Sequence, residues 1–304
     1  MGLLSKWVES LDYEYEILTS CTHHRSPRST CEKCLDVCEE EAISFVKGKP
    51  VIIRKNCVEC GNCISACPVQ AVAGIFPKRT VTENKLVITS DHKPTVKELL
   101  VLHKKGVNEL ISENTTTIEP WKHVVDEANV MLKQLEKEPF FITIKALEME
   151  EDRYSRRELF SFWKKESESL MKQVAPAKWR FNHDQLDLAK YYPDYQFTAI
   201  SVDVSKCSLC KACMFLCSKK CLDITETGFT LTAQTCSSCQ LCVDVCPEKA
   251  ITIEDKIMKV NDVQYPVLNK TCNVCKNSFE TLREHDEKCV ICTKQEGLGY
   301  LSSH

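Results

Sequence analysis

The sequence predicts a mixed α+β protein that is assembled from several small modules around metal-binding cysteines. Three observations lead to this prediction. The chain of 304 residues contains 21 cysteines, which fall into three blocks at residues 21–67, 207–246 and 272–292. The spacing of the cysteines repeats within and between the first two blocks. The cysteine-free segment between them alternates short apolar runs with amphipathic helical patterns, which is typical of a small α/β unit.

The composition excludes several classes of protein. Apolar residues make up 43% of the chain and charged residues 27%, and the formal net charge is −3. This balance gives no electrostatic footprint for nucleic acid or for an anionic membrane. The amino terminus lacks the pattern of a signal peptide, and no apolar run is long enough to span a membrane. We therefore expect a cytoplasmic protein whose reduced cysteines bind metal instead of forming disulfides.

The second block of cysteines shows the repeat without a gap. It contains two C-x2-C-x2-C-x3-C runs that are offset by 29 residues: Cys207, Cys210, Cys213 and Cys217, then Cys236, Cys239, Cys242 and Cys246. The first block has nearly the same spacing, and seven of its cysteines superimpose on the second block at an offset of 179 residues. Neither chance nor a disulfide framework would preserve that register.

An iron–sulfur cubane explains this spacing. The cluster needs four thiolates at the corners of a tetrahedron, and two-residue spacings let one tight loop supply three of them. The fourth thiolate then comes from the other run, after its three-residue spacing. A pair of structural zinc sites is the alternative, but zinc favours separate C-x2-C pairs over runs of four cysteines. The spacing therefore favours iron–sulfur clusters.

Both blocks resemble the bacterial two-cluster (2[4Fe–4S]) ferredoxins, in which the fourth cysteine of each run ligates the other cluster. The resemblance implies two ferredoxin-like modules, built as βαβ units with hairpins, that hold up to four [4Fe–4S] clusters. It also assigns three complete ligand sets, which are Cys57, Cys60, Cys63 and Cys38; Cys207, Cys210, Cys213 and Cys246; and Cys236, Cys239, Cys242 and Cys217.

The remaining cluster is irregular at one ligand. Its expected set is Cys31, Cys34, Cys67 and Cys21. The register places the first ligand at Arg28, so that Cys21, seven residues upstream, is the expected substitute, with His23 and His24 as weaker candidates. Three outcomes stay open: a [4Fe–4S] cluster completed by Cys21, a [3Fe–4S] cluster, or no cluster. Cys221 could compete with Cys217, but we expect it to be a buried free thiol.

Local patterns agree with the resemblance. Apolar runs at residues 42–46 and 50–54 surround Lys47-Gly48-Lys49, and residues 222–225 and 229–232 flank Thr227-Gly228 in the same way. Both patterns predict a β-hairpin. The short helices of the modules are expected to begin at the Cys-Pro steps, which are Cys67-Pro68 and Cys246-Pro247.

The middle of the chain is expected to be a small α/β unit with a parallel sheet. Strands are predicted at residues 85–89, 108–111 and 140–144, and helices from Pro94 and over residues 119–135. No glycine-rich phosphate-binding motif occurs, so we expect a docking or scaffold role for this unit. A capping box formed by Ser155 and Glu158 predicts a further helix to about residue 173, and the segment 176–197 is expected to be a linker.

The carboxyl-terminal segment contains two further C-x2-C pairs: Cys272 and Cys275, then Cys289 and Cys292. Two such pairs at this distance predict a tetrahedral site in a zinc-ribbon-like knuckle. A rubredoxin-like iron is an alternative metal, and Cys272, Cys275, His285 and Cys289 form an alternative ligand set. Zinc does not change its oxidation state, so the site would be structural or would bind a partner.

These predictions divide the chain into five segments. They are a first ferredoxin-like module (1–79), the α/β unit (80–150), a helix and linker (151–197), a second ferredoxin-like module (198–262) and the zinc-ribbon-like knuckle (263–304). The whole resembles iron–sulfur subunits that serve molybdopterin oxidoreductases, formate dehydrogenases and hydrogenases. We therefore expect a protein that relays single electrons between partner oxidoreductases and has no activity of its own.

Two other functions are weighed against electron relay. The clusters could feed a catalytic centre in the same chain, but the radical-generating C-x3-C-x2-C motif is absent and no catalytic pattern stands out. The protein could instead be a non-redox assembly factor or a redox sensor for a larger oxidoreductase. The irregular first module and the zinc site give this second alternative its support.

Overall fold

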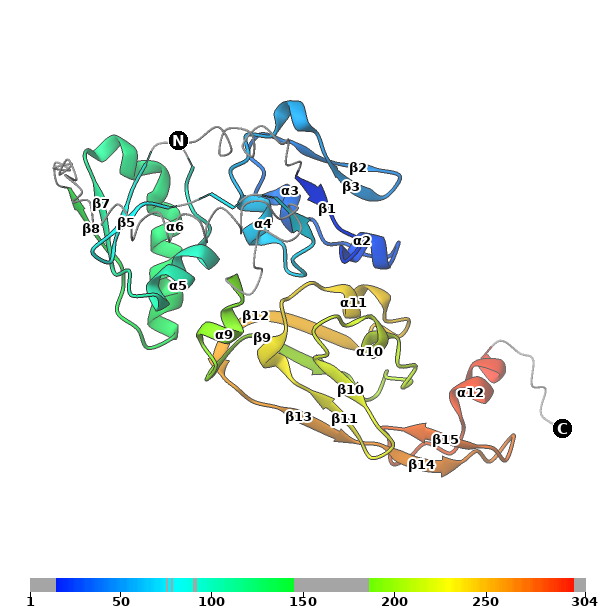
Figure 1. Ribbon diagram of the computed structural model, residues 1–304. Coiled ribbons are helices and arrows are strands. Elements are labelled where there is room, and N and C mark those ends of the chain that lie inside the picture. The colour runs from blue at the N-terminus through cyan, green and yellow to red at the C-terminus, as the bar shows by residue number, and fades with distance from the viewer. Residues whose placement is uncertain (1–14, 75, 78, 90–91, 145–185, 298–304) are drawn as a thin grey trace, which may run out of the picture. The chain divides into compact units, whose positions relative to one another are not determined.

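The structure is a computed structural model in which the chain divides into two compact units (Figure 1). Unit 1 contains residues 1–21 and 32–191, and unit 2 contains residues 22–31 and 192–304. Each unit mixes helices and strands, as the sequence predicts. The predicted helix at residues 155–173 lies outside the described residues. The structure describes residues 15–74, 76–77, 79–89, 92–144 and 186–297.

The amino-terminal part of unit 1 contains two antiparallel strand pairs separated by short helices. In chain order its elements are β1 (Glu16–Ile17), α3 (Lys33–Asp36), β2 (Ile43–Val46), β3 (Lys49–Ile52), the 3-10 helix η1 (Arg54–Asn56), α4 (Asn62–Ala66) and β4 (Val72–Ala73). The outer strands β1 and β4 pair with each other. The inner strands β2 and β3 form the first predicted hairpin.

Unit 2 repeats this order of elements. They are β9 (Tyr195–Val202), α10 (Ala212–Leu216), β10 (Leu222–Ile224), β11 (Gly228–Leu231), the 3-10 helix η3 (Ala233–Thr235), α11 (Leu241–Val245) and β12 (Ile251–Lys259). The outer strands β9 and β12 again pair antiparallel, and β10 and β11 form the second predicted hairpin. Adding 179 to both bounds of η1 and of α4 gives the bounds of η3 and of α11. The elements therefore repeat at the offset that relates the cysteines.

The helices α4 and α11 end at the Cys-Pro steps, so the expectation that they begin there is wrong. Cys67 has φ −62° and ψ 115°, and Cys246 has φ −66° and ψ 114°, which are extended conformations. The ring of a proline clashes with a helical conformation in the residue before it. Each helix therefore ends at the residue before the cysteine, and the cysteine itself belongs to the loop that follows.

The middle of unit 1 is the α/β unit that the sequence predicts. Its elements are β5 (Val81–Thr82), β6 (Lys85–Val87), α5 (Val96–Lys104), β7 (Glu109–Ser112), α6 (Thr115–Gln134) and β8 (Phe141–Ile144). Strands β6, β7 and β8 are parallel, while β5, which was not predicted, joins the edge in the antiparallel direction. Figure 1 shows α5 and α6 beside this sheet. Leu86, Leu99, Leu110 and Leu132 are fully buried and form its core.

The helix α6 begins four residues earlier than the predicted start at residue 119. Asn114 caps it, because its Oδ1 accepts a hydrogen bond of 3.0 Å from the backbone N–H of Thr117. Pro120 consequently lies in the second turn, where it removes one backbone hydrogen bond of the helix. The apolar stripe alone predicted a start at residue 119, whereas the cap by Asn114 sets the start at Thr115.

Side-chain contacts join the amino-terminal part of unit 1 to its α/β unit. Ser65 Oγ in α4 is hydrogen-bonded to Thr95 Oγ1, and Thr95 also caps α5. Lys93 forms an ion pair with Glu39. The helix α9 (Leu188–Tyr191) packs on α5 at the end of this unit. These two parts of the chain therefore share one interior.

Unit 2 contains further elements beyond this repeat. They are α2 (Thr22–Arg25), β13 (Val263–Pro266), β14 (Leu268–Thr271), β15 (Ser278–Thr281) and α12 (Val290–Gly297). Strand β13 pairs with β11, and β14 and β15 form a hairpin. The carboxylate of Asp244 accepts hydrogen bonds from the N–H and hydroxyl of Thr30, at 2.8 and 2.9 Å. No helix in the described part of the chain has the length and apolarity needed to cross a membrane.

Candidate metal centres

The cysteines assigned to one cluster of the first module converge on one cavity in unit 1. All four line it, namely Cys38, Cys57, Cys60 and Cys63. Burial, and after it the neighbouring charges of Cys60 and Cys57, raise the pKa of Cys63 to about 12. Thiolates crowded in this way are favoured only beside a cationic partner, which iron would supply. The residues therefore fit a metal cluster.

The two assigned sites of unit 2 are also assembled. Cys207, Cys210, Cys213 and Cys246 line a small cavity of about 20 Å³. The other set, Cys236, Cys239, Cys242 and Cys217, is mutually close. Burial raises the pKa of Cys242 most, and the charges of the other three cysteines of this set raise it too. Three of the four predicted ligand sets are thus brought together.

In each unit, cysteines from two different predicted ligand sets lie close together. Cys34 lies near enough to Cys63 to raise its pKa, and Cys213 does the same to Cys242. In each pair, the two cysteines belong to different predicted ligand sets.

The three regular C-x2-C-x2-C loops share an uncommon backbone conformation. In each loop the residues on either side of the second cysteine have positive φ: Glu59 (57°) and Gly61 (77°), Leu209 (50°) and Lys211 (62°), and Ser238 (55°) and Gln240 (60°). Left-handed residues that alternate with right-handed ones turn successive backbone N–H groups toward one point, and such nests bind anions, including iron–sulfur clusters. The irregular loop differs, since Glu32 has φ −117° and Thr30 has no positive φ.

The fourth cysteine of every run also has the same surroundings. Its sulfur accepts a hydrogen bond from the backbone N–H four residues later: Ala42 to Cys38 (3.2 Å), Ala71 to Cys67 (3.1 Å), Cys221 to Cys217 (3.3 Å) and Ala250 to Cys246 (3.3 Å). The residue before each donor has positive φ, namely Glu41, Gln70, Lys220 and Lys249. Hydrogen bonds of this kind hold a thiolate in place and stabilise its charge.

The irregular set is partly assembled within unit 1. Cys21, Cys34 and Cys67 belong to one buried cluster of side chains, and Cys21 is near enough to raise the pKa of Cys67, after the larger effect of burial. Cys31 ends the segment 22–31 that belongs to unit 2. There the Nε2 of His23 donates to the carbonyl oxygen of Cys31 at 2.8 Å.

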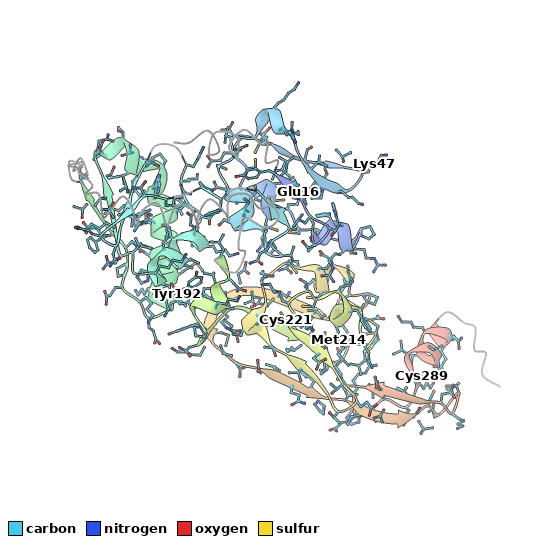
Figure 2. The ribbon with its side chains drawn as sticks, in the orientation of Figure 1. Glu16, Lys47, Tyr192, Met214, Cys221 and Cys289 are labelled. Atoms are coloured by element: carbon cyan, nitrogen blue, oxygen red, sulfur yellow. The ribbon has the colours of Figure 1, made fainter. Side chains whose placement is uncertain are left out.

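Cys221, which Figure 2 labels, is buried, as predicted, but it has neighbours that the sequence did not reveal. Its Sγ lies 3.5 Å from Thr235 Oγ1, and its backbone N–H donates to Cys217 Sγ at 3.3 Å. Its thiol is also near enough to the sulfurs of Cys217 and Cys236 to lower the pKa of each to about 6, while the pKa of Cys221 itself rises. Cys221 is therefore a protonated thiol beside two predicted cluster ligands from different runs.

The carboxyl-terminal cysteines form a tighter site. The sulfurs of Cys272, Cys275, Cys289 and Cys292 all lie within 4.8 Å of one another, and His285 is not part of this group. Cys275 Sγ lies 3.9 Å from Cys289 Sγ, close to the ~3.8 Å expected for two sulfurs bound tetrahedrally to one zinc ion. Burial raises the pKa of Cys272, but hydrogen bonds from backbone amides, first that of Cys275, outweigh it and bring the value to about 6. These positions suit a single metal ion.

Comparison with known proteins agrees with this geometry. Residues 28–71 match the 4Fe-4S dicluster domain family. Over 44 residues, the chain is 36% identical to an uncharacterized ferredoxin of Methanocaldococcus jannaschii. That similarity covers 14% of this chain and 29% of the ferredoxin, so the chain matches less than a third of the relative's length. Residues 28–71 are therefore similar to a 4Fe–4S dicluster domain, and over this segment the chain resembles ferredoxin-type iron–sulfur proteins.

Proposed function

We propose that the protein relays single electrons between partner oxidoreductases through up to four [4Fe–4S] clusters in two ferredoxin-like modules. Three clusters would use the complete ligand sets around Cys57, Cys207 and Cys236. A fourth would use Cys31, Cys34, Cys67 and Cys21. The carboxyl-terminal four-cysteine site would hold one Zn²⁺ and keep the hairpin β14–β15 attached to α12.

One observation carries this proposal. Three loops with the same cysteine spacing adopt the same sequence of left-handed residues, although five of the six residues concerned are not glycine. Left-handed conformations are costly for residues with a Cβ and persist where the surroundings require them. The same kind of anionic ligand in each loop, accepting hydrogen bonds from the loop amides, would explain why all three loops adopt these conformations.

The middle α/β unit and the partners are part of the same proposal. The α/β unit would serve as a docking surface or scaffold for a partner, such as a molybdopterin oxidoreductase or a hydrogenase. Each module holds two neighbouring sites, which suits transfer of one electron at a time from an entry cluster to an exit cluster. No substrate site of the chain's own is required for this role.

Metal analysis of protein purified without oxygen tests the proposal. Four cubanes require about sixteen iron atoms and as much acid-labile sulfide per chain, and the carboxyl-terminal site adds about one zinc. EPR of the reduced protein should show coupled [4Fe–4S]⁺ signals. A colourless protein without labile sulfide would exclude electron transfer by clusters.

A redox sensor or assembly factor is the second candidate, because the irregular site differs from the other three. Its loop lacks the two left-handed residues, so fewer amides can hold a cluster there. A sensor should lose iron from this site in air while it keeps the other three clusters, and should then bind its partner differently. A carrier should keep the same partner affinity before and after brief exposure to air.

A further inference from the structure

Unit 1 contains a cavity that is much larger than a cluster site needs. Its volume is about 410 Å³, and one wall is formed by the four cysteines of the Cys57 site. The cavity at the Cys207 site of unit 2 has a volume of only about 20 Å³ by the same measure. A cluster alone therefore does not account for the space, and 410 Å³ lies within the range of pockets that bind small molecules.

The opposite wall comes from the α/β unit. It includes Thr89, which follows β6, and Thr116 and Thr117 in the first turn of α6, which follows β7. These residues lie at the carboxyl ends of two adjacent parallel strands. Ligands of open α/β sheets bind at this edge, where loops connect the strands to the helices that follow them. The cavity thus lies between the cysteines of the Cys57 site and the carboxyl ends of strands β6 and β7.

The walls favour a flat apolar ligand. Trp121 and Pro120 contribute from α6, and Val37, Val58, Ile43 and Ile52 contribute from the cluster module. Trp121 is held in place, because the guanidinium of Arg79 lies 5.9 Å from its ring centroid and is itself bound to Glu98 at 2.8 Å. A fixed indole ring is a stacking partner for a planar aromatic molecule.

The charges of the cavity argue against a phosphate-bearing ligand. Of the described residues that line it, Lys93 is positive, but it is paired with Glu39, and Glu40 adds a second carboxylate. The cluster thiolates next to them are anionic as well. The hydroxyls of Thr116 and Thr117 already donate to Asn114, so Thr89 is the threonine whose hydroxyl can donate to an uncharged carbonyl oxygen.

We propose that this cavity binds a small, uncharged, planar aromatic molecule of the quinone class beside the Cys57 site, an inference that rests on the proposed cluster ligands. The aromatic ring lies against Trp121, and one of its carbonyl oxygens accepts a hydrogen bond from the hydroxyl of Thr89. Such a ligand would lie directly beside the proposed cluster, within the same chain.

Equilibrium dialysis of menadione against the oxygen-free holoprotein tests the inference. Thr116→Trp places a large side chain in the cavity from an exposed position and should raise the Kd for menadione at least about ten-fold, which corresponds to about 1.4 kcal/mol. Thr115→Trp is the matched control, since Thr115 is exposed on the same helical turn but does not line the cavity. It should leave the Kd unchanged.

Iron and visible absorption are measured in each sample, which separates this inference from the proposed function. Protein without clusters would refute the electron relay. Protein with all its clusters that shows no saturable binding of menadione would refute the quinone site alone. Equal affinity in the two tryptophan variants, or tighter binding of flavin mononucleotide than of menadione, would also overturn it.

Discussion

Cys21 is the residue on which the number of complete clusters depends. It lies in the buried core of unit 1 with Cys34 and Cys67, whereas the register of the repeat expects a ligand at Arg28. A cysteine displaced by seven residues can still serve, because a cluster is ligated by position in space and not by position in the chain.

We predict that Cys21→Ser lowers the iron content of the oxygen-free protein. The loss should be about one iron atom if a three-iron cluster survives and about four if the whole cluster is lost. Iron and labile sulfide per chain, together with EPR of the oxidised sample, measure the effect. Cys221→Ser is the matched control, because it also removes a buried cysteine outside the four runs, and it should keep its iron. An unchanged iron content in Cys21→Ser would exclude Cys21 as a ligand.

Cys221 is expected to tune one cluster without ligating it. Its single S–H lies beside the sulfurs of Cys217 and Cys236 and can donate to either, and its backbone N–H donates to Cys217 at 3.3 Å. Hydrogen bonds to ligand sulfur stabilise the more negative, reduced cluster. Cys221→Ala should therefore lower the reduction potential of this cluster, by about 40 mV if the lost bonds are worth about 1 kcal/mol.

Potentiometric titration followed by EPR measures this shift. Cys221→Ser should restore part of the potential, because a hydroxyl still donates a hydrogen bond. Cluster loss in Cys221→Ala, with the other clusters intact, would instead show that Cys221 is itself a ligand.

At the scale of elements, the cluster loops depend on backbone conformations that L-residues rarely adopt. Gly61 is the one glycine among the six left-handed residues of these loops, and a Cβ placed on it would lie 2.4 Å from Cδ of Pro77. Gly48, in the turn of the hairpin β2–β3, has a similar φ of 74° but nothing within 4 Å of its Cβ position. Comparing substitutions at the two glycines therefore distinguishes the effect of backbone strain from the effect of steric overlap.

We expect Gly61→Ala to be more harmful than Gly48→Ala. Both changes incur the strain of a left-handed alanine, about 1–2 kcal/mol. Only Gly61→Ala also forces the cluster loop away from Pro77, so it should lower the temperature at which the visible absorption of the clusters is lost. Thermal melting followed at visible wavelengths compares the two variants. Equal melting temperatures would mean that the loop can move away from Pro77 without disturbing the cluster.

At the scale of the whole molecule, the candidate metal sites are of two kinds. The carboxyl-terminal sulfurs lie within 4.8 Å of one another, which suits one ion, while the four cysteines of the Cys57 site line a cavity of about 410 Å³. Because the ligand sets share no residue, metal binding at one kind of site should be independent of the other.

Cys289→Ser should therefore remove about one zinc per chain and leave the iron content unchanged. The hairpin β14–β15 and α12 should become more accessible to proteases, since metal binding at a four-cysteine site contributes directly to folding. Metal analysis with limited proteolysis tests both effects. Loss of iron from this variant would mean that the site holds iron or that it supports the clusters.

The hairpins, the parallel sheet and the assembled cysteine sets could be predicted from the sequence, because each depends on local spacing. The hairpin β10–β11 follows from Thr227-Gly228 between two apolar runs, and the sets follow from the C-x2-C repeats. The start of α6 could not be predicted from its apolar stripe, since the cap by Asn114 lies outside the stripe. The sequence also did not show on which side of the Cys-Pro steps the short helices lie. A proline can end a helix at the preceding residue as readily as it can begin one.

The sequence by itself determined the chemistry of this protein: how many thiolates there are, in what register, and hence the ferredoxin-type iron–sulfur domain. Only the tertiary structure decided how those thiolates are held. Leu209, Lys211 and Gln240 adopt left-handed backbone conformations that nothing in their residue types predicts. The cavity between the Cys57 site and α6 arises from packing of segments more than fifty residues apart. Local sequence motifs specify side-chain chemistry. Strained backbone conformations and cavities instead depend on contacts between distant parts of the chain.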